Sequence, residues 1–265
     1  MTTDQIMWEI ENVGHAGASQ RHAIAASQAV LVFTVSIFLA TVVSAEDRTV
    51  RISDATTDKD GFLTHTVESP YQAGQTEIRV LLPERLEQGK RYPVVYLLPV
   101  EAYNESHYGS GLLEVKQHDF HKKCPAIFVA PTFSGTPWYA DHPTNPLIRQ
   151  ETYFLNVVVP FIERRYPAQR KASGRLLLGF SKSGWGAFSL MLHYPDVFRR
   201  AAAWDAPLMK DKPNQYGMGD IFGTQENFEK YQIAKLLERH ATELRGQKRL
   251  PARRCRRNLR LRGVP

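Results

Sequence analysis

The most constraining feature of this 265-residue sequence is a buried strand that runs directly into a turn of small residues and then into a helix. The stretch is Leu176-Leu-Leu-Gly-Phe-Ser-Lys-Ser-Gly-Trp-Gly-Ala187. A turn of this kind tolerates only small flanking residues, and it lifts its central serine to the carboxyl end of the strand. We therefore expect a strand at residues 175–180, a helix at residues 184–194 and an exposed Ser181 between them. The alternative is a glycine-rich turn that does no more than allow close packing.

Short apolar runs and helical stretches alternate along the rest of the chain. Runs rich in β-branched and other apolar residues predict strands at residues 78–82, 94–98, 126–130 and 200–204. Helical stretches occur at residues 147–166, where Pro160 interrupts the pattern, and at residues 228–244, whose apolar stripe should dock on the sheet. Strands that alternate with helices form a parallel sheet covered on both faces. The sequence therefore predicts the α/β class.

Taken together, these segments resemble the Putative esterase family of α/β-hydrolases, the group that includes esterase D and the mycolyltransferases. Glu77-Ile-Arg-Val-Leu-Leu-Pro83 and Lys90-Arg-Tyr-Pro-Val-Val-Tyr-Leu-Leu98 look like the family's first strand, short hairpin and second strand. Val157-Val-Val-Pro-Phe-Ile-Glu-Arg-Arg-Tyr166 resembles the helix before the nucleophile strand. Residues 179–184 fall on the family's Gly-His-Ser-Met-Gly-Gly. The resemblance covers about residues 75–249 and implies a mostly parallel α/β-hydrolase sheet with helices on both faces.

The resemblance also implies roles for individual residues. Ser181 matches the nucleophile of an ester hydrolase or acyltransferase, and the backbone N–H of Lys182 would stabilise the oxyanion at a helix N-terminus. The family commonly has His-Gly after its second strand, whereas this chain has Pro99-Val100-Glu101, and proline has no N–H. The second oxyanion donor would then be the N–H of Val100 or Glu101. Asp205, after the strand at residues 200–204, is a candidate acid, although a lone Asp there can equally brace the loop.

A catalytic base is harder to find. In the family the acid and the histidine follow the nucleophile, but only His193 and His240 follow Ser181 in this sequence. His193 lies at the far end of the helix after Ser181, roughly 18 Å along its axis at about 1.5 Å per residue, and His240 belongs to the surface of the last helix. We therefore expect no histidine within hydrogen-bonding reach of Ser181. The one exception to test is His142, whose loop could border the cleft.

The positive charge is concentrated at the C-terminal end. Nine of the 34 Lys and Arg residues lie at 245–265, where there is no acidic residue, so 25 remain against 27 Asp and Glu. Residues 250–265 show no apolar period, and no further strand follows. We expect residues 46–249 to form an incomplete α/β-hydrolase domain lacking its C-terminal strands, with a non-native Arg-rich tail at 250–265. The alternative, a basic arm for nucleic acid or membrane, conflicts with the nearly neutral body.

The N-terminal region has the pattern of an export signal. No charged residue lies between Arg21 and Glu46, and the most apolar part, residues 29–43, is shorter than the roughly 20 residues that span a bilayer. It ends in Val43-Ser44-Ala45, which fits a signal-peptidase site. We expect residues 1–45 to be an N-terminal extension with a signal peptide, followed by a polar approach, and the protein to be secreted or periplasmic. The alternative is an uncleaved membrane anchor, and only then is a membrane a partner.

Metal and cofactor chemistry are not predicted. The two cysteines, Cys124 and Cys255, form no CxxC motif, and His107, His118 and His121 are spaced too irregularly for a metal site. The resemblance implies no cofactor, no nucleic-acid partner and a small-molecule or carbohydrate ester as substrate. Two other functions remain open at this point: a catalytically inactive, truncated hydrolase that lacks its acid and histidine, and a non-catalytic carbohydrate-binding module.

The export signal gives the first testable prediction. Protein recovered from the secreted or periplasmic fraction of an expressing cell should begin at Glu46, because cleavage follows Ala45. N-terminal sequencing or intact mass measures this directly. Recovery of the chain only in the membrane fraction, with residues 1–45 still attached, would replace secretion with anchoring.

Overall fold

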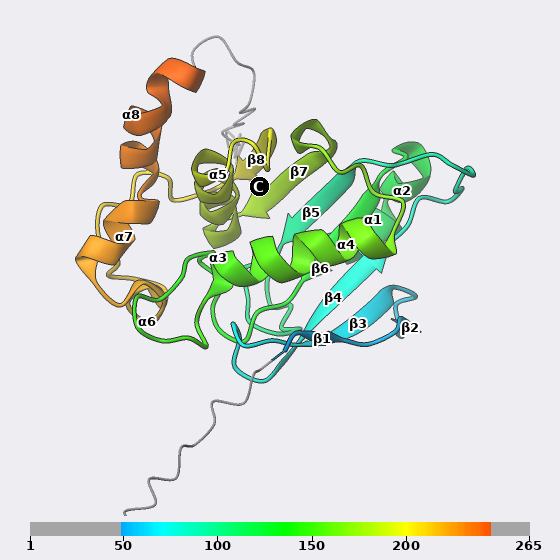
Figure 1. Ribbon diagram of the computed structural model, residues 1–265, viewed down its shortest axis with the longest axis horizontal. Helices are drawn as coiled ribbons and strands as arrows, with labels where there is room; N and C mark the ends of the chain where they lie inside the picture. Colours follow the sequence, from blue (N-terminus) through cyan, green and yellow to red (C-terminus); the bar gives the residue numbers. More distant parts are fainter. Residues whose placement is uncertain (1–48, 245–265) are drawn as a thin grey trace, which may run out of the picture. The chain divides into compact units, whose positions relative to one another are not determined.

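The computed structural model describes residues 49–244, which build an eight-stranded sheet (Figure 1). The order is β1-β3-β4-β6-β5-β7-β8, with β2 paired to β3. The strands are β1 (Arg51–Ile52), β2 (Thr56–Thr57), β3 (Leu63–Glu68), β4 (Gln75–Leu81), β5 (Val94–Leu98), β6 (Ile127–Pro131), β7 (Arg175–Phe180) and β8 (Arg200–Trp204). Strands β6, β5, β7 and β8 are parallel, and β4, β3 and β1 continue the sheet in antiparallel pairs. The predicted α/β class is confirmed.

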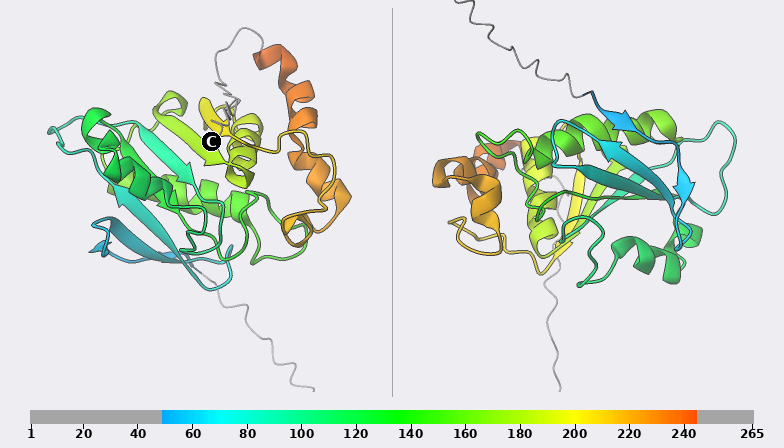
Figure 2. Two further views of the ribbon diagram at one scale, coloured as in Figure 1. Left: turned by 180° about the vertical axis from the view of Figure 1, so that it is seen from behind. Right: turned by 90° about the horizontal axis from the view of Figure 1, so that it is seen from below.

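Helices lie on both faces of this sheet (Figure 2). They are α1 (Gly111–Gln117), α2 (Phe120–Lys123), α3 (Gln150–Tyr153), the π-helix η1 (Phe154–Val158), α4 (Val159–Arg165), the 3-10 helix η2 (Ala172–Gly174), α5 (Lys182–His193), α6 (Met218–Phe222), α7 (Gln225–Tyr231) and α8 (Ile233–Leu244). Strand β5 divides the core between the two faces. Val94 and Tyr96 pack with the larger cluster, which holds α3, α4 and α5, while Leu97 packs with the smaller one under α1.

The helix predicted at residues 147–166 runs without a break from Gln150 to Arg165 and widens in the middle. Pro160 does not interrupt it. Instead, the Val159 N–H donates to the carbonyl of Phe154, five residues back, and α3 joins α4 through the π-turn η1. Proline lacks an N–H and its ring would collide with the carbonyl four residues earlier in a regular helix. The wider turn accommodates Pro160 without ending the helix.

In the first half of the chain the structure adds three strands that were not predicted and overturns the expected hairpin. The polar approach to the domain contains three strands, of which β3 pairs along its whole length with β4. The segment from β4 to β5 is not a hairpin, because β6 lies between the two strands and pairs with both. A strand that arrives later in the sequence thus separates two strands that are consecutive in the chain.

The last helical stretch also departs from the prediction. It is split at Gln232 into α7 and α8, and it packs on helix α5 rather than directly on the sheet. The ring of Phe228 in α7 stacks on Trp185 in α5, with centroids 6.2 Å apart. Helix α5 therefore lies between the sheet and the α7–α8 pair (Figure 1).

The expected leader at residues 1–45 and the Arg-rich tail at residues 250–265 lie outside residues 49–244. Within the described range, β8 is the last strand, and it forms one edge of the sheet. None of the helices between residues 49 and 244 has the length and apolar character needed to cross a membrane.

The contact between α5 and the loop after β6 gives the second prediction. A Cβ atom at Gly186 would lie 2.0 Å from Cδ2 of Tyr139, whose side chain is fully buried. The change Gly186→Ala should lower the free energy of unfolding by about 2 kcal/mol, because overpacking outweighs the gain in helix propensity. Gly219→Ala is the control, since its nearest neighbour would be 3.8 Å away. Urea unfolding measures both variants, and an equal change in the free energy of unfolding for Gly186→Ala and Gly219→Ala would contradict the prediction.

Candidate active site

Ser181 occupies the sharp turn between β7 and α5. Its backbone has φ 50° and ψ −121°, a conformation that non-glycine residues rarely adopt, and its side chain is partly exposed. The Ser181 N–H donates to the carbonyl of Trp204 at 3.1 Å, which ties the turn to the end of β8. The predicted position between a strand and a helix is therefore confirmed. Backbone strain held in place by neighbouring elements is a common property of functional sites.

The glycines on either side of Ser181 leave room for this turn. A Cβ atom at Gly179 would lie 2.2 Å from the carbonyl oxygen of Ser183, within the first turn of α5. A Cβ atom at Gly184 would lie 2.8 Å from the methyl group of Ala206 and 2.9 Å from that of Ala203. The chain can reverse from strand to helix here only because both positions lack a side chain.

Ser183 does more than the sequence suggested. The sequence pattern indicated only that a serine at position 183 is small enough for the bend. In the structure the Ser183 side chain is fully buried and holds the turn together through two hydrogen bonds, which we call the Ser183 clasp. Its Oγ accepts a hydrogen bond from the Phe180 N–H and donates one to the Phe180 carbonyl, both at 2.9 Å. The signal in the sequence was Ser183 itself, which stands three residues after the end of β7 at a position where the family pattern has glycine.

Lys182 begins helix α5, so its N–H has no acceptor within the helix and points toward the turn. Its side chain is half-buried. Loss of hydration lowers the pKa of the Lys182 ammonium, and the carboxylates of Glu101 and Glu105 oppose this shift. Within residues 49–244 this backbone N–H has no hydrogen-bond acceptor, and it lies at the N-terminus of a twelve-residue helix, where the helix dipole favours negative charge.

Val100 lies at the same edge of the sheet as Ser181. Strands β5 and β7 are parallel neighbours in which Leu98 pairs with Gly179, and Val100 and Ser181 follow two residues beyond this pair. Val100 is buried, and its N–H makes no hydrogen bond within residues 49–244. The alternative oxyanion donor is the backbone N–H of Glu101. The side-chain carboxylate of the same residue accepts a hydrogen bond from the Tyr108 N–H at 3.1 Å.

Asp205 directly follows β8 and is also close in the fold to the turn. Trp204, the residue before it, pairs with Phe180 in the sheet and accepts the Ser181 N–H. Asp205 has φ 52° and is exposed, and its carboxylate makes no hydrogen bond or ion pair with another described residue. Its placement after the strand at residues 200–204 agrees with the prediction.

Six histidines within residues 49–244 make no hydrogen bond to the turn at Ser181. None of those at positions 65, 107, 118, 121, 142 and 193 is hydrogen-bonded to the Ser181 hydroxyl. His193, the last residue of α5, contacts Glu151 through Nδ1 at 2.9 Å and the Lys230 carbonyl through Nε2 at 2.8 Å. The prediction for His193 is confirmed. His240 lies in α8 and is partly buried.

His142 does not complete the site. Its Nδ1 accepts the N–H groups of Thr144 and Asn145 at 3.2 and 2.9 Å, and its Nε2 faces Gly223. The neighbouring Asp141 is held by Arg149 and Thr152. Residues 49–244 contain no cluster of three or more His, Cys, Asp or Glu side chains placed to hold a metal ion.

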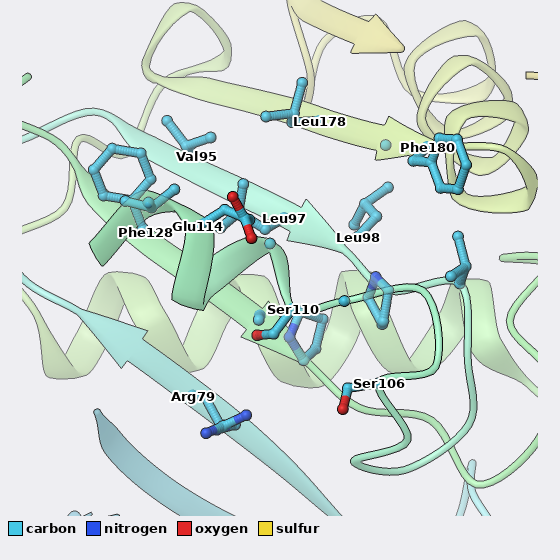
Figure 3. A pocket seen from close by; sticks show the side chains of 18 of the residues that line it. Arg79, Val95, Leu97, Leu98, Ser106, Ser110, Glu114, Phe128, Leu178 and Phe180 are labelled. Carbon is cyan, nitrogen blue, oxygen red and sulfur yellow. The ribbon is translucent and has the colours of Figure 1, made fainter. Parts of the chain in front are cut away.

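A groove of about 690 Å³ crosses the sheet face beside α1 and reaches the end of β7 (Figure 3). Its lining is mostly apolar, and side chains of β5, β6 and β7 project into it. The end nearest Ser181 is formed by Phe180 and Trp204, whose ring centroids are 5.5 Å apart. Trp204 is 45% exposed, so an apolar surface continues to the turn.

The Ser183 clasp gives the third prediction. Ser183→Ala removes a buried donor and acceptor and should lower the free energy of unfolding by about 1–3 kcal/mol. Ser189→Ala is a matched control, because Ser189 is equally buried in α5 but makes only one long bond, 3.4 Å, to the Tyr231 carbonyl. Denaturant unfolding measures both. An equal loss in the two variants would show that the clasp adds nothing to stability.

Comparisons with known proteins agree with this architecture. Two curated esterases of Mycobacterium tuberculosis, from strains CDC 1551 and H37Rv, are each 27% identical over 134 residues. The match covers 49% of this chain but only 29% of each relative. The chain therefore aligns with less than a third of the length of these proteins.

Among solved structures, an S-formylglutathione hydrolase from Agrobacterium tumefaciens superimposes with a TM-score of 0.57 at 15% identity, covering 77% of this chain and 90% of that one. The Mycobacterium tuberculosis protein MPT51 gives a TM-score of 0.50 at 16% identity, with 72% of each chain covered. These likenesses concern the fold. The profile of the Putative esterase family matches residues 69–243, and the chain belongs to this family.

Proposed function

We propose that this protein is a serine esterase in which Ser181 is the nucleophile. The observation that carries the proposal is the strained backbone of Ser181, at φ 50° and ψ −121°, between a parallel strand and the N-terminus of α5. This arrangement presents a hydroxyl at the sheet edge beside a helix dipole. Membership of an esterase family supports the same chemistry.

Two backbone N–H groups are suited to stabilise the oxyanion. One is the N–H of Lys182 at the start of α5, and the other is the N–H of Val100 after β5. Both lie at the carboxyl end of adjacent parallel strands, close in the fold to Ser181. One such donor is typically worth about 10²–10³ in kcat.

The reaction proceeds in two halves. The Ser181 oxygen attacks the ester carbonyl carbon, and the carbonyl oxygen becomes an oxyanion facing the two N–H groups. The step requires a base to take the Ser181 proton, and no described side chain is hydrogen-bonded to the Ser181 hydroxyl in that role. Collapse of this intermediate breaks the bond to the leaving alcohol, which takes up the proton, and leaves an acyl group on Ser181. Water, or a sugar hydroxyl in an acyl transfer, then attacks the acyl carbon and breaks its bond to the Ser181 oxygen. The carboxylic acid or the new ester leaves, and the proton of the attacking hydroxyl returns the serine to its free form.

The groove beside the turn supports an ester whose acyl or aromatic part is apolar. Phe180 and Trp204 offer ring faces at the end nearest Ser181, and the sheet face beyond them is apolar. Such rings also suit stacking against a sugar. We propose a small-molecule or carbohydrate ester as substrate, and export of the protein through residues 1–45 as part of the same proposal.

A second candidate is that the chain is catalytically silent. It is favoured by one observation, that none of the histidines at positions 65, 107, 118, 121, 142 and 193 is hydrogen-bonded to Ser181. A serine hydroxyl needs a base within roughly 2.6–3.2 Å to react near neutral pH. Without one, catalysis falls to a residual of about 10³–10⁴ over water, from the oxyanion donors and binding alone. Asp205 would then brace its loop rather than orient a histidine.

The fourth prediction separates the two candidates. A fluorophosphonate probe should label the protein at Ser181, as found by peptide mass spectrometry, and p-nitrophenyl ester hydrolysis should fall to background in Ser181→Ala. Ser189→Ala, buried in the same helix, should keep the wild-type rate of labelling. A wild-type chain that reacts no faster than Ser181→Ala would support the silent chain and overturn the esterase proposal.

His142 requires its own variant in that experiment. Because its Nδ1 accepts two backbone N–H groups and its Nε2 faces Gly223, we expect His142→Ala to leave the rate of Ser181 labelling unchanged. A loss of labelling in both Ser181→Ala and His142→Ala would mean that the loop moves over the turn and that His142 is the base.

A further inference from the structure

Tyr139 connects the two parts of the proposed oxyanion site, although it touches neither N–H. It lies in the loop between β6 and α3 and its side chain is fully buried. The Tyr139 hydroxyl donates a hydrogen bond of 2.6 Å to the carbonyl of Pro99. That carbonyl belongs to the peptide group whose nitrogen is Val100.

The hydrogen bond constrains where the Val100 N–H points. The atoms of a peptide group lie in one plane, and in the trans form its C=O and N–H point in opposite directions. A donor held on the Pro99 oxygen therefore fixes the rotation of the whole group. The Val100 N–H, which makes no hydrogen bond of its own within the described residues, is left facing away from Tyr139.

The ring of Tyr139 rests on the other part of the site. It lies against the backbone of α5 at Gly186, where a Cβ would come within 2.0 Å of Cδ2 and 2.6 Å of Cγ. Gly186 is four residues after Lys182, one helical turn along the same face. The same side chain thus contacts the helix that carries one donor and holds the peptide that carries the other.

Tyr139 is itself held in place. Its backbone has φ 57°, and its N–H donates to the side-chain oxygen of Gln150 at 2.9 Å. The same oxygen also accepts the Trp138 N–H at 2.9 Å, while the Gln150 amide donates to the Thr136 carbonyl at 3.0 Å. Burial raises the pKa of the Tyr139 hydroxyl well above its usual range, so the group stays a donor.

We infer that Tyr139 is the positioning residue of the oxyanion site, where its hydroxyl fixes the Pro99–Val100 peptide so that the Val100 N–H faces the substrate carbonyl. The inference rests on the proposed function and deepens it. It assigns a role to a residue that lies about forty positions before Ser181 and that no motif indicates.

The fifth prediction is a test with Tyr139→Phe, which keeps the ring on Gly186 and removes only the hydroxyl. The matched control is Tyr153→Phe, since Tyr153 is equally buried and its hydroxyl bonds to Thr76, within the core rather than at the site. For Tyr139→Phe we expect kcat for a p-nitrophenyl ester to fall about tenfold with KM unchanged. The expected fall is smaller than the loss of about 10²–10³ in kcat that follows removal of a donor, because the Val100 N–H is still present but no longer held in position.

A second measurement does not depend on turnover. In a ¹⁵N spectrum of the unliganded protein, the Val100 amide should shift and lose order in Tyr139→Phe, and should stay as in wild type in Tyr153→Phe. An unchanged Val100 amide in Tyr139→Phe overturns the inference and leaves the proposed function standing. A fall in kcat that is equal in the two variants also overturns it, because the effect would then be general loss of core packing.

The failure of the proposed function gives a different result. If the wild type and Ser181→Ala react equally with the ester and with a fluorophosphonate probe, there is no serine esterase and the oxyanion role of Tyr139 falls with it. A shift of the Val100 amide signal in Tyr139→Phe would then show only that the bond from Tyr139 to Pro99 holds the local backbone, with no role in catalysis.

Discussion

Helix α5 can approach the end of the sheet as closely as it does because Gly184, the residue that faces Ala203 and Ala206, has no side chain. Gly184 faces Ala203 and Ala206 at distances that leave no space for a Cβ, and Gly186 lies under the ring of Tyr139. The helix N-terminus is thereby brought to the ends of β7 and β8. Every other feature of the site depends on this approach, because the strained turn at Ser181 exists only where strand and helix nearly touch.

The close approach is stabilised by polar contacts as well as by packing. The Ser183 hydroxyl bonds to both backbone groups of Phe180, and the Ser181 N–H bonds to the end of β8. On the other side of α5, Trp185 and Phe228 stack and connect the helix to α7. Helix α5 is therefore fixed from the sheet and from the α7–α8 pair, which keeps its free N–H groups in position.

Local pattern was sufficient for the elements whose sequence decides their own structure. The strands at residues 94–98, 175–180 and 200–204 match β5, β7 and β8 at both ends, because runs of apolar residues there are bounded by proline, glycine or a charged residue. The turn at Ser181 was found for the same reason. Its small residues leave few other structures open to the chain.

The features that sequence missed depend on contacts between distant segments. The pairing of β6 between β4 and β5 is decided by the sheet as a whole, and no local pattern records it. The bond from Tyr139 to Pro99 joins residues forty positions apart, so a tyrosine in a loop gave no sign of it. The docking of α7 and α8 on α5 was missed for the same reason. An apolar stripe shows that one face of a helix is buried, but it does not show which element packs against that face.

The π-turn η1 has a consequence for how related chains can differ in length. A turn closed by a bond from Val159 to Phe154 contains one residue more than an α-helical turn. In a chain without Pro160, deleting one residue within this turn would restore ordinary pitch and leave the helix on both sides in its present rotation. Deleting one elsewhere would turn all that follows by about 100° and move the core residues of α4 away from the sheet. A related chain that lacks Pro160 can therefore lose a single residue at η1 without repacking the core.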